Sequence, residues 1–210
     1  MQIGVLALQG DFQKHLEMLA RLPNVTSFPV RTRDDVLRCD GLIIPGGEST
    51  TVGKLMARYG MDEAIKQRAA EGMPVFGTCT GMILLAAQIE RSDQPRLELM
   101  DITVRRNAFG RQVDSFETDV QVNCLGPKPV RAIFIRAPFV TQAGSEVDVL
   151  ARLDAGEIVM VRQGRCLAAA FHPELTEDTR VHEYFVGLAR AEAYQISPSE
   201  YAPAPRSSRV

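Results

Sequence analysis

The sequence has no excess of basic residues, few cysteines and no long hydrophobic run. Its formal net charge is -2 and its pI is about 6.0, so it lacks the basic surface typical of nucleic-acid binding. The N-terminus has no basic segment leading into an apolar core, and no apolar stretch reaches the ~18 to 20 residues that span a bilayer. We therefore expect a cytoplasmic protein that binds neither nucleic acid nor membrane.

Only four cysteines are spread over the 210 residues. They form no Cys-x-x-Cys pair, and no cysteine and histidine cluster has the spacing of a zinc site. We therefore expect no disulfide framework, no metal and no cofactor. The composition, 45% hydrophobic and 24% charged residues, is that of an ordinary globular protein with one sizeable core.

The two halves of the chain show different patterns. In the first half, apolar strand-like segments alternate with segments of helical spacing, which predicts an α/β fold with a mostly parallel sheet and helices on both faces. The second half has short strand-like segments, which indicates extra antiparallel strands. The expected strands are 2–8, 25–30, 41–44, 74–78, 99–105, 117–122, 130–135, 147–153, 158–162 and 166–171, and the expected helices are 11–22, 52–59, 61–71, 79–87 and 179–194.

The composition changes once more near the end of the chain. Residues 197–210 are rich in Pro, Ser and Ala and have little to bury. We therefore expect one domain over residues 1–196, followed by a tail to which we assign no function.

Cys79 lies in a Gly-x-Cys-x-Gly frame between an expected strand and an expected helix. A sharp turn at this point exposes a nucleophile at the strand end, and the helix N-terminus favours a thiolate. The backbone amide of Thr80 then faces an oxyanion formed beside the sulfur. A buried structural cysteine explains the apolar surroundings equally well, so this segment alone leaves both interpretations open.

A glycine turn, residues 45–51 (PGGESTT), follows an earlier expected strand. Its amides would lie at the carboxyl edge of a parallel sheet, where α/β folds bind ligands. A Gly-Lys pair follows as in a phosphate loop, but Glu48 replaces the first glycine of that motif and Leu55 its final Ser or Thr. The turn is therefore either a ligand loop or a tight turn capped by Ser49 or Thr50.

Two arginines, Arg106 and Arg136, are candidates for binding a carboxylate. Arg106 lies in a segment with three arginines around a glycine, and Arg136 ends an expected strand. Guanidinium groups bind carboxylates through paired hydrogen bonds, although solvated surface charges explain the same pattern.

His172 and Glu174 follow a late expected strand. If the chain stays extended, both side chains point to the same side, and the carboxylate can hold one imidazole nitrogen while the other acts as a base. His15 and His182 lie on expected helices without such a neighbour, so we expect them to be structural or solvent-facing. Together with Cys79, the pair forms a nucleophile, a base and its orienter, which indicates acyl transfer through a thioester.

These motifs also resemble a known family. Over roughly residues 1–192, the chain is similar to class I glutamine amidotransferases and, within them, to the glutaminase subunits of pyridoxal 5'-phosphate synthases. The frame around Cys79 and the His-x-Glu pair are shared by the wider class. The segments 45–51 (PGGESTT) and 106–112 (RNAFGRQ) are more specific to the subunit family.

The resemblance implies a three-layer fold and hydrolysis of L-glutamine to glutamate and ammonia. The ammonia would pass to a separate synthase subunit, in a heteromeric complex, for pyridoxal 5'-phosphate (vitamin B6) biosynthesis. At matching positions, Cys79 would be the nucleophile, His172 the general base and acid, and Glu174 its orienter. The oxyanion amides would be those of Gly47 and Thr80, and the glutamine-binding residues would be Gly47, Glu48, Ser49, Arg106, Ile135 and Arg136.

Two other functions remain open at this point. One is the glutaminase of another pathway, such as histidine biosynthesis, and the other is a catalytically silent binding subunit that keeps the fold. The chain departs from the family pattern at Thr80, where alanine is usual, so the branched side chain could crowd the pocket.

Overall fold

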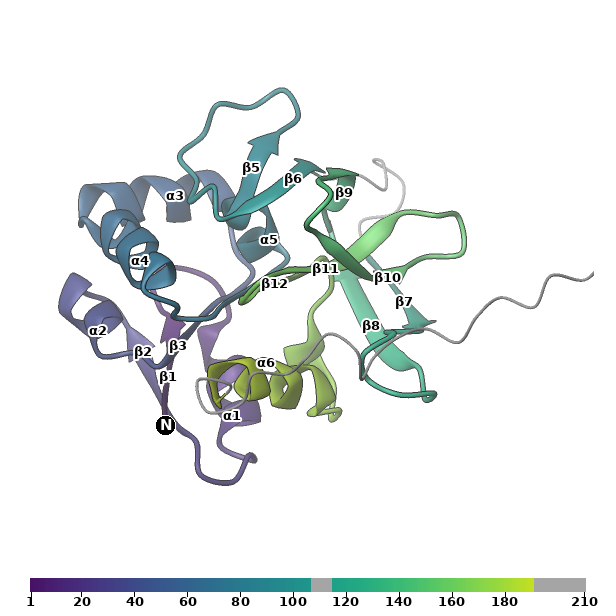
Figure 1. Cartoon of the computed structure of the whole chain (residues 1–210), viewed down its shortest axis with the longest axis horizontal. Coiled ribbons are helices and arrows are strands. Elements are labelled where there is room, and N and C mark those ends of the chain that lie inside the picture. Colours follow the sequence, from purple (N-terminus) through teal and green to yellow (C-terminus); the bar gives the residue numbers. More distant parts are fainter. Residues whose placement is uncertain (107–114, 191–210) are drawn as a thin grey trace, which may run out of the picture.

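The computed structural model describes residues 1–106 and 115–190 of the chain (Figure 1). Three sequence expectations lie wholly or partly outside the described residues. These are the part of the arginine-rich segment that follows Arg106, the end of the helix expected over residues 179–194 with the domain boundary at residue 196, and the tail expected over residues 197–210.

Within the described residues, the strands form one ten-stranded sheet and a separate two-stranded ribbon (Figure 1). The sheet contains β1 (Gln2–Leu6), β2 (Thr26–Val30), β3 (Gly41–Ile44), β4 (Val75–Thr78), β5 (Ala86–Ile89), β6 (Met100–Arg105), β9 (Phe139–Ala143), β10 (Asp148–Arg152), β11 (Ile158–Gln163) and β12 (Cys166–Ala169). The ribbon consists of β7 (Ser115–Val120) and β8 (Val130–Ile135).

The strand order in the sheet is β2-β1-β3-β4-β12-β11-β9-β6-β5, with β10 paired to β11. Neighbouring strands from β2 to β12 are parallel, and those from β12 to β6 are antiparallel. Every residue of β3 and β4 is buried, as expected of parallel strands covered on both faces. The predicted α/β fold, with a mostly parallel central sheet and added antiparallel strands, is confirmed.

Helices cover both faces of the parallel strands. The helices are α1 (Phe12–Leu19), α2 (Arg33–Leu37), α3 (Ser49–Arg58), α4 (Met61–Ala70), α5 (Thr80–Leu85) and α6 (Arg180–Arg190), with a short 3-10 helix, η1 (Pro173–Leu175). Figure 1 shows α1 and α6 together on one side of the sheet and α3 and α4 on the other. In residues 1–106 and 115–190, no helix is long and apolar enough to cross a membrane.

The N-terminus of α3 differs from the sequence expectation. Glu48, rather than Ser49 or Thr50, is the N-cap, and its carboxylate accepts hydrogen bonds from the amides of Thr50 at 3.0 Å and Thr51 at 2.8 Å. A carboxylate suits this position because it satisfies free amides and lies at the positive end of the helix dipole. The hydroxyl of Thr51 also donates to Glu48, and these bonds lower the pKa of Glu48 to about 2.

The expected helix over residues 79–87 is wrong at its end, because α5 stops at Leu85 and β5 begins at Ala86. The carbonyls of Leu84 and Leu85 accept hydrogen bonds from the amides of Leu97 at 2.7 Å and Leu99 at 3.0 Å. Strand β5 then pairs with β6. Long-range pairing thus overrides local helix propensity, and for the same reason the sequence pattern does not predict β9.

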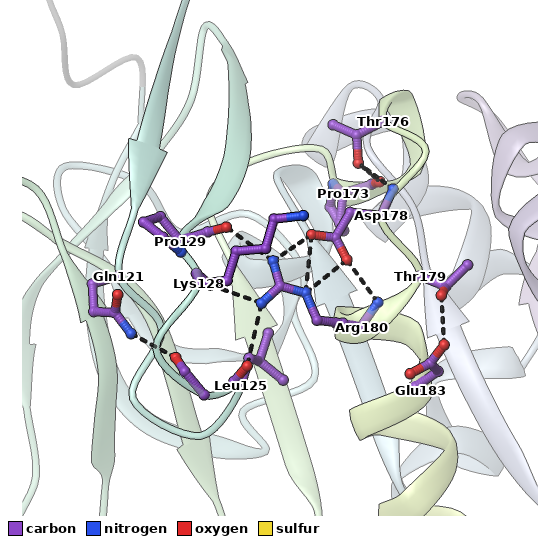
Figure 2. Close-up of polar contacts among 11 residues, drawn as sticks. Gln121, Leu125, Lys128, Pro129, Pro173, Thr176, Asp178, Thr179, Arg180 and Glu183 are labelled. Carbon is purple, nitrogen blue, oxygen red and sulfur yellow. Dashed lines mark hydrogen bonds and ion pairs between the residues drawn. The ribbon is translucent and has the colours of Figure 1, made fainter.

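Arg180, the first residue of α6, joins this helix to the loop before β8. Figure 2 shows its guanidinium donating to the carbonyls of Leu125, Lys128 and Pro129, at 3.2, 2.7 and 2.9 Å, while it pairs with Asp178 at 2.6 Å. The contact links the chain that follows η1 to the start of β8. The segment after η1 and the start of β8 are therefore held side by side.

Gly53 of α3 and Gly187 of α6 form a matched pair for a test of helix packing. An alanine Cβ at Gly53 would lie 2.5 Å from the carbonyl oxygen of Pro95, whereas one at Gly187 would meet nothing within 4 Å. We expect Gly187→Ala to raise the free energy of unfolding by roughly 0.5–1 kcal/mol, and Gly53→Ala to lower it by roughly 1–3 kcal/mol. Urea denaturation of both variants measures the difference. Equal effects would show that Gly53 is not required by close packing.

Candidate active site

Cys79 lies on a sharp turn between β4 and α5, as the sequence predicts. Its backbone angles, φ 49° and ψ -102°, are rare for a residue with a side chain and typical of a strained functional turn. Glycines permit the turn, because a Cβ on Gly77 would lie 2.4 Å from the carbonyl carbon of Gly81, and one on Gly81 would lie 2.2 Å from the oxygen of Ile44. The amide of Cys79 donates to the carbonyl of Ala169 at 2.8 Å, which fixes the turn to β12.

The end of β8, with Ile135 and the following Arg136, lies beside Cys79. The sulfur of Cys79 lies 3.8 Å from the carbonyl oxygen of Ile135. Arg136, the next residue, has an exposed side chain and a φ of 44°, a strained conformation for a residue with a side chain.

The glycine turn after β3 packs against both Cys79's helix and His172. The hydroxyl of Thr80 donates a hydrogen bond to the carbonyl of Gly47 at 2.6 Å, so this side chain is turned toward the loop. A Cβ on Gly46 would lie 2.5 Å from Cε1 of His172, so the turn backs directly onto the imidazole. Three strand ends therefore converge at one edge of the sheet, as the parallel arrangement predicts.

His172 and Glu174 form the expected pair, with 2.7 Å between His172 Nδ1 and Glu174 Oε1. The backbone is not extended as expected, because Pro173–Leu175 form η1 and the amide of Leu175 donates to the carbonyl of His172 at 3.3 Å. Proline suits the first position of this turn, since that position has no use for an N–H group. The side chain of Glu174 is only 1% exposed, so its charge is buried.

Interactions within the site shift the protonation of both groups. Burial lowers the pKa of His172, but its interactions with Cys79 and Glu174 outweigh burial and raise the pKa to about 10. Burial likewise disfavours the charged form of Glu174, yet His15 and His172 hold the pKa of this carboxyl well below its ordinary value. The carboxylate therefore stabilises the protonated form of the imidazole, which is the form that His172 takes when it accepts the thiol proton of Cys79.

Arg106 meets the start of α3 through Gln94. Arg106 Nη1 donates to Gln94 Oε1 at 2.8 Å, and Arg106 Nη2 lies 3.5 Å from Glu48 Oε1. The same oxygen of Gln94 accepts hydrogen bonds from the hydroxyls of Ser49 and Thr50, both at 3.2 Å. Gln94 thus connects Arg106 with Ser49, and Arg106 lies directly beside Glu48.

His15 and His182 do not face solvent, since both are fully buried. Their burial fits the structural alternative, but His15 does have a carboxylate neighbour in space, because its Nε2 lies 3.4 Å from Glu174 Oε2. Helix α1 carries His15 to η1, and α6 places His182 Nε2 2.9 Å from His15 Nδ1. Spacing along the sequence gives no sign of either contact.

The sequence and the fold both match glutamine amidotransferases. A model of the SNO glutamine amidotransferase family matches residues 5–190. The chain belongs to this family. It is 58% identical over 191 residues to the pyridoxal 5'-phosphate synthase subunit PdxT of Herpetosiphon aurantiacus, covering 90% of this chain and 100% of that relative. It is 54% identical over 186 residues to the protein of the same name from Carboxydothermus hydrogenoformans, covering 89% and 96%.

Solved structures of the same fold extend the comparison. A crystal structure of a glutamine amidotransferase is 50% identical, with a TM-score of 0.84, and covers 89% of this chain and 98% of that one. A putative GMP synthase subunit from Thermoplasma acidophilum shares 16% identity at a TM-score of 0.64, covering 92% and 96%, so it shows a similar fold only. The family resemblance drawn from the sequence motifs is therefore confirmed.

Three polar residues near the site were not identified from the sequence as functional candidates. Gln9 accepts a hydrogen bond from the amide of Glu48 at 2.7 Å, and it lies in the loop that follows β1, a position comparable to those of the other loops of the site. Gln94 lies in a loop without a pattern, and His15 has the spacing of an ordinary core residue of α1. Only Gln9 had a signal that strand-end reasoning could have found.

The buried His182 makes the fold sensitive to acid. Burial, with a smaller effect from His15, lowers the pKa of His182 to about 3, below the ordinary 6.5. Between these values the unfolded chain binds a proton that the folded chain does not, so this contribution to stability is full above pH 6.5 and is lost as the pH falls. We expect the free energy of unfolding to fall between about pH 6.5 and 5 with a slope approaching ~1.4 kcal/mol per pH unit.

The control is His182→Leu, in which the slope over this window should be shallower. Carboxyl groups contribute little there, because their ordinary pKa values are lower. Urea unfolding at several pH values measures both slopes, and parallel slopes in the two proteins would contradict this account of His182.

Proposed function

We propose that Cys79, His172 and Glu174 hydrolyse the side-chain amide of L-glutamine. The observation that carries the proposal is that an imidazole held 2.7 Å from a buried carboxylate interacts with a cysteine on a strained turn. This combination supplies a nucleophile, a base and an orienter. The chain is then the glutaminase subunit of a pyridoxal 5'-phosphate synthase, in keeping with its PdxT relatives.

The reaction has two halves. His172 takes the thiol proton, and Cys79 Sγ attacks the amide carbon to give a tetrahedral oxyanion. The C–N bond then breaks as His172 gives its proton to the nitrogen. The nitrogen leaves as ammonia, and the acyl group remains on Cys79 as a thioester. Water attacks the thioester, with His172 first accepting its proton and then returning a proton to the sulfur as glutamate leaves.

The oxyanion would be bound by the backbone amides of Gly47 and Thr80. The hydrogen bond from the Thr80 hydroxyl to the carbonyl of Gly47 supports this assignment, because it holds the two backbone segments together. Preorganised amides of this kind stabilise the charge that develops in the transition state without reorganisation.

The amino-acid part of glutamine carries a carboxylate and an ammonium group, which require charged partners. Arg106 and Arg136 are suited to the carboxylate, and Glu48 to the ammonium group. The proposed binding residues also include Gly47, Ser49 and Ile135. The carbonyl oxygen of Ile135 lies 3.8 Å from Cys79 Sγ, which supports its place in the site.

The ammonia would pass to a synthase subunit in a heteromeric cytoplasmic complex. A histidine-pathway glutaminase is not favoured, because the relatives of 52–58% identity are pyridoxal 5'-phosphate synthase subunits. A catalytically silent subunit is not favoured either, since the Cys79 turn and the His172 to Glu174 hydrogen bond are both intact.

Ammonia release from glutamine tests the function directly. We expect release by the purified chain mixed with its synthase subunit, and much less by the chain alone. Cys79→Ala should reduce the rate in the complex by at least ~10³-fold, because the covalent route is lost. A Cys79→Ala complex with wild-type turnover would refute the mechanism, and activation by a histidine-pathway synthase instead would establish the alternative.

Gln94 provides a separate test of the substrate site. Replacing Gln94 with Leu removes the oxygen shared by Arg106 and Ser49, so we expect the KM for glutamine to rise roughly tenfold while kcat changes little. The matched control is Gln94→Glu, which keeps an acceptor oxygen and should change KM less. Steady-state kinetics in the complex measure both, and an unchanged KM in Gln94→Leu would contradict this role.

A further inference from the structure

A line of buried polar side chains extends from Glu174 on the side away from His172. His15 of α1 lies between Glu174 and His182, with Thr78 of β4 beside it. His15 Nε2 is 3.1 Å from Thr78 Oγ1 and 3.4 Å from Glu174 Oε2. The three residues other than Glu174 have no solvent exposure at all.

Burying this cluster of polar side chains in the core costs free energy. Each buried polar atom must find a partner, and apolar residues of similar size would fill the space without this demand. The line ends on the oxygen of Glu174 that His172 does not use. Within the described chain, Glu174 Oε2 makes no hydrogen bond of normal geometry, and Nε2 of His15 lies 3.4 Å from it.

The partners of the two imidazoles decide where the protons lie. If His182 Nε2 donates to His15 Nδ1, then His15 Nε2 carries a proton that points at Thr78 and Glu174. His182 Nδ1 has no hydrogen-bond partner among the described residues, and in this arrangement it is an acceptor without a proton. The opposite arrangement would bury an N–H donor without a partner and would turn a lone pair of His15 toward the carboxylate, so it is disfavoured.

We propose that His15 is a positioning residue for the catalytic pair: its Nε2–H holds the second oxygen of Glu174 so that the first oxygen stays aligned with His172 Nδ1. The inference rests on the proposed glutaminase function and deepens it. A carboxylate bound at one oxygen only is free to rotate about its last bond, and the imidazole it orients would then lose its alignment with the sulfur.

Two polar replacements separate the two nitrogens of His15. The amide nitrogen of glutamine can take the place of Nε2 and donate toward Glu174, whereas the amide oxygen of asparagine can take the place of Nδ1 and accept from His182. Leucine removes both. The three variants His15→Gln, His15→Asn and His15→Leu therefore test the contact with Glu174 separately from the filling of the core.

We expect His15→Leu and His15→Asn to lower kcat for ammonia release roughly tenfold, with KM for glutamine within about twofold of wild type. His15→Gln should recover most of the lost kcat. All are measured in the complex with the synthase subunit, well below the melting temperature found by thermal unfolding. A role only in core packing would lower the melting temperature of the variants without separating kcat of the Gln variant from that of the Asn variant.

The outcomes are distinct. Recovery by Gln but not by Asn supports the inference. Folded Leu and Asn variants with wild-type kcat, equal kcat of the Gln and Asn variants, or a rise in KM with unchanged kcat, would each overturn it. Loss of ammonia release from the wild-type complex would instead defeat the proposed function itself.

Discussion

The buried carboxylate of Glu174 is the group on which the arrangement of the site depends. An ionised carboxylate with a 1% exposed side chain is unstable in a protein interior unless donors surround it. His172 contacts one oxygen at 2.7 Å and His15 approaches the other at 3.4 Å. Helix α1, the segment after β12 and, through His182, helix α6 must therefore all be in place before the imidazole is oriented.

The parallel sheet makes this convergence possible. Residues 47, 79 and 172 are far apart in the sequence, yet each follows a strand of the parallel part of the sheet, and these strands end at the same edge. The glycine turn lies against both the helix that follows Cys79 and the ring of His172. Strand β8 of the separate ribbon places the carbonyl oxygen of Ile135 close to the sulfur of Cys79. Arg180 joins the loop before β8 to α6.

Much of this could be predicted from the sequence, because strand-end signals are local. The turn at Cys79, the glycine turn and the pairing of His172 with Glu174 all follow from short motifs. Other features depend on contacts between distant segments and leave no local pattern. Strand β5 forms because residues 97–99 take the carbonyls at the end of α5, and His15 and Gln94 become parts of the site only through tertiary packing.

The central claim is that Cys79 is the acyl acceptor, and site-specific labelling tests it most directly. The other cysteines serve as internal controls, since burial raises the pKa of Cys166 to about 11 and that of Cys39 to about 12. Intact mass and peptide mapping of the complex, after treatment with an electrophilic glutamine analogue, should find one adduct, on Cys79, that glutamine suppresses. An unlabelled Cys79, or labelling spread over the other cysteines and unaffected by glutamine, would contradict the account.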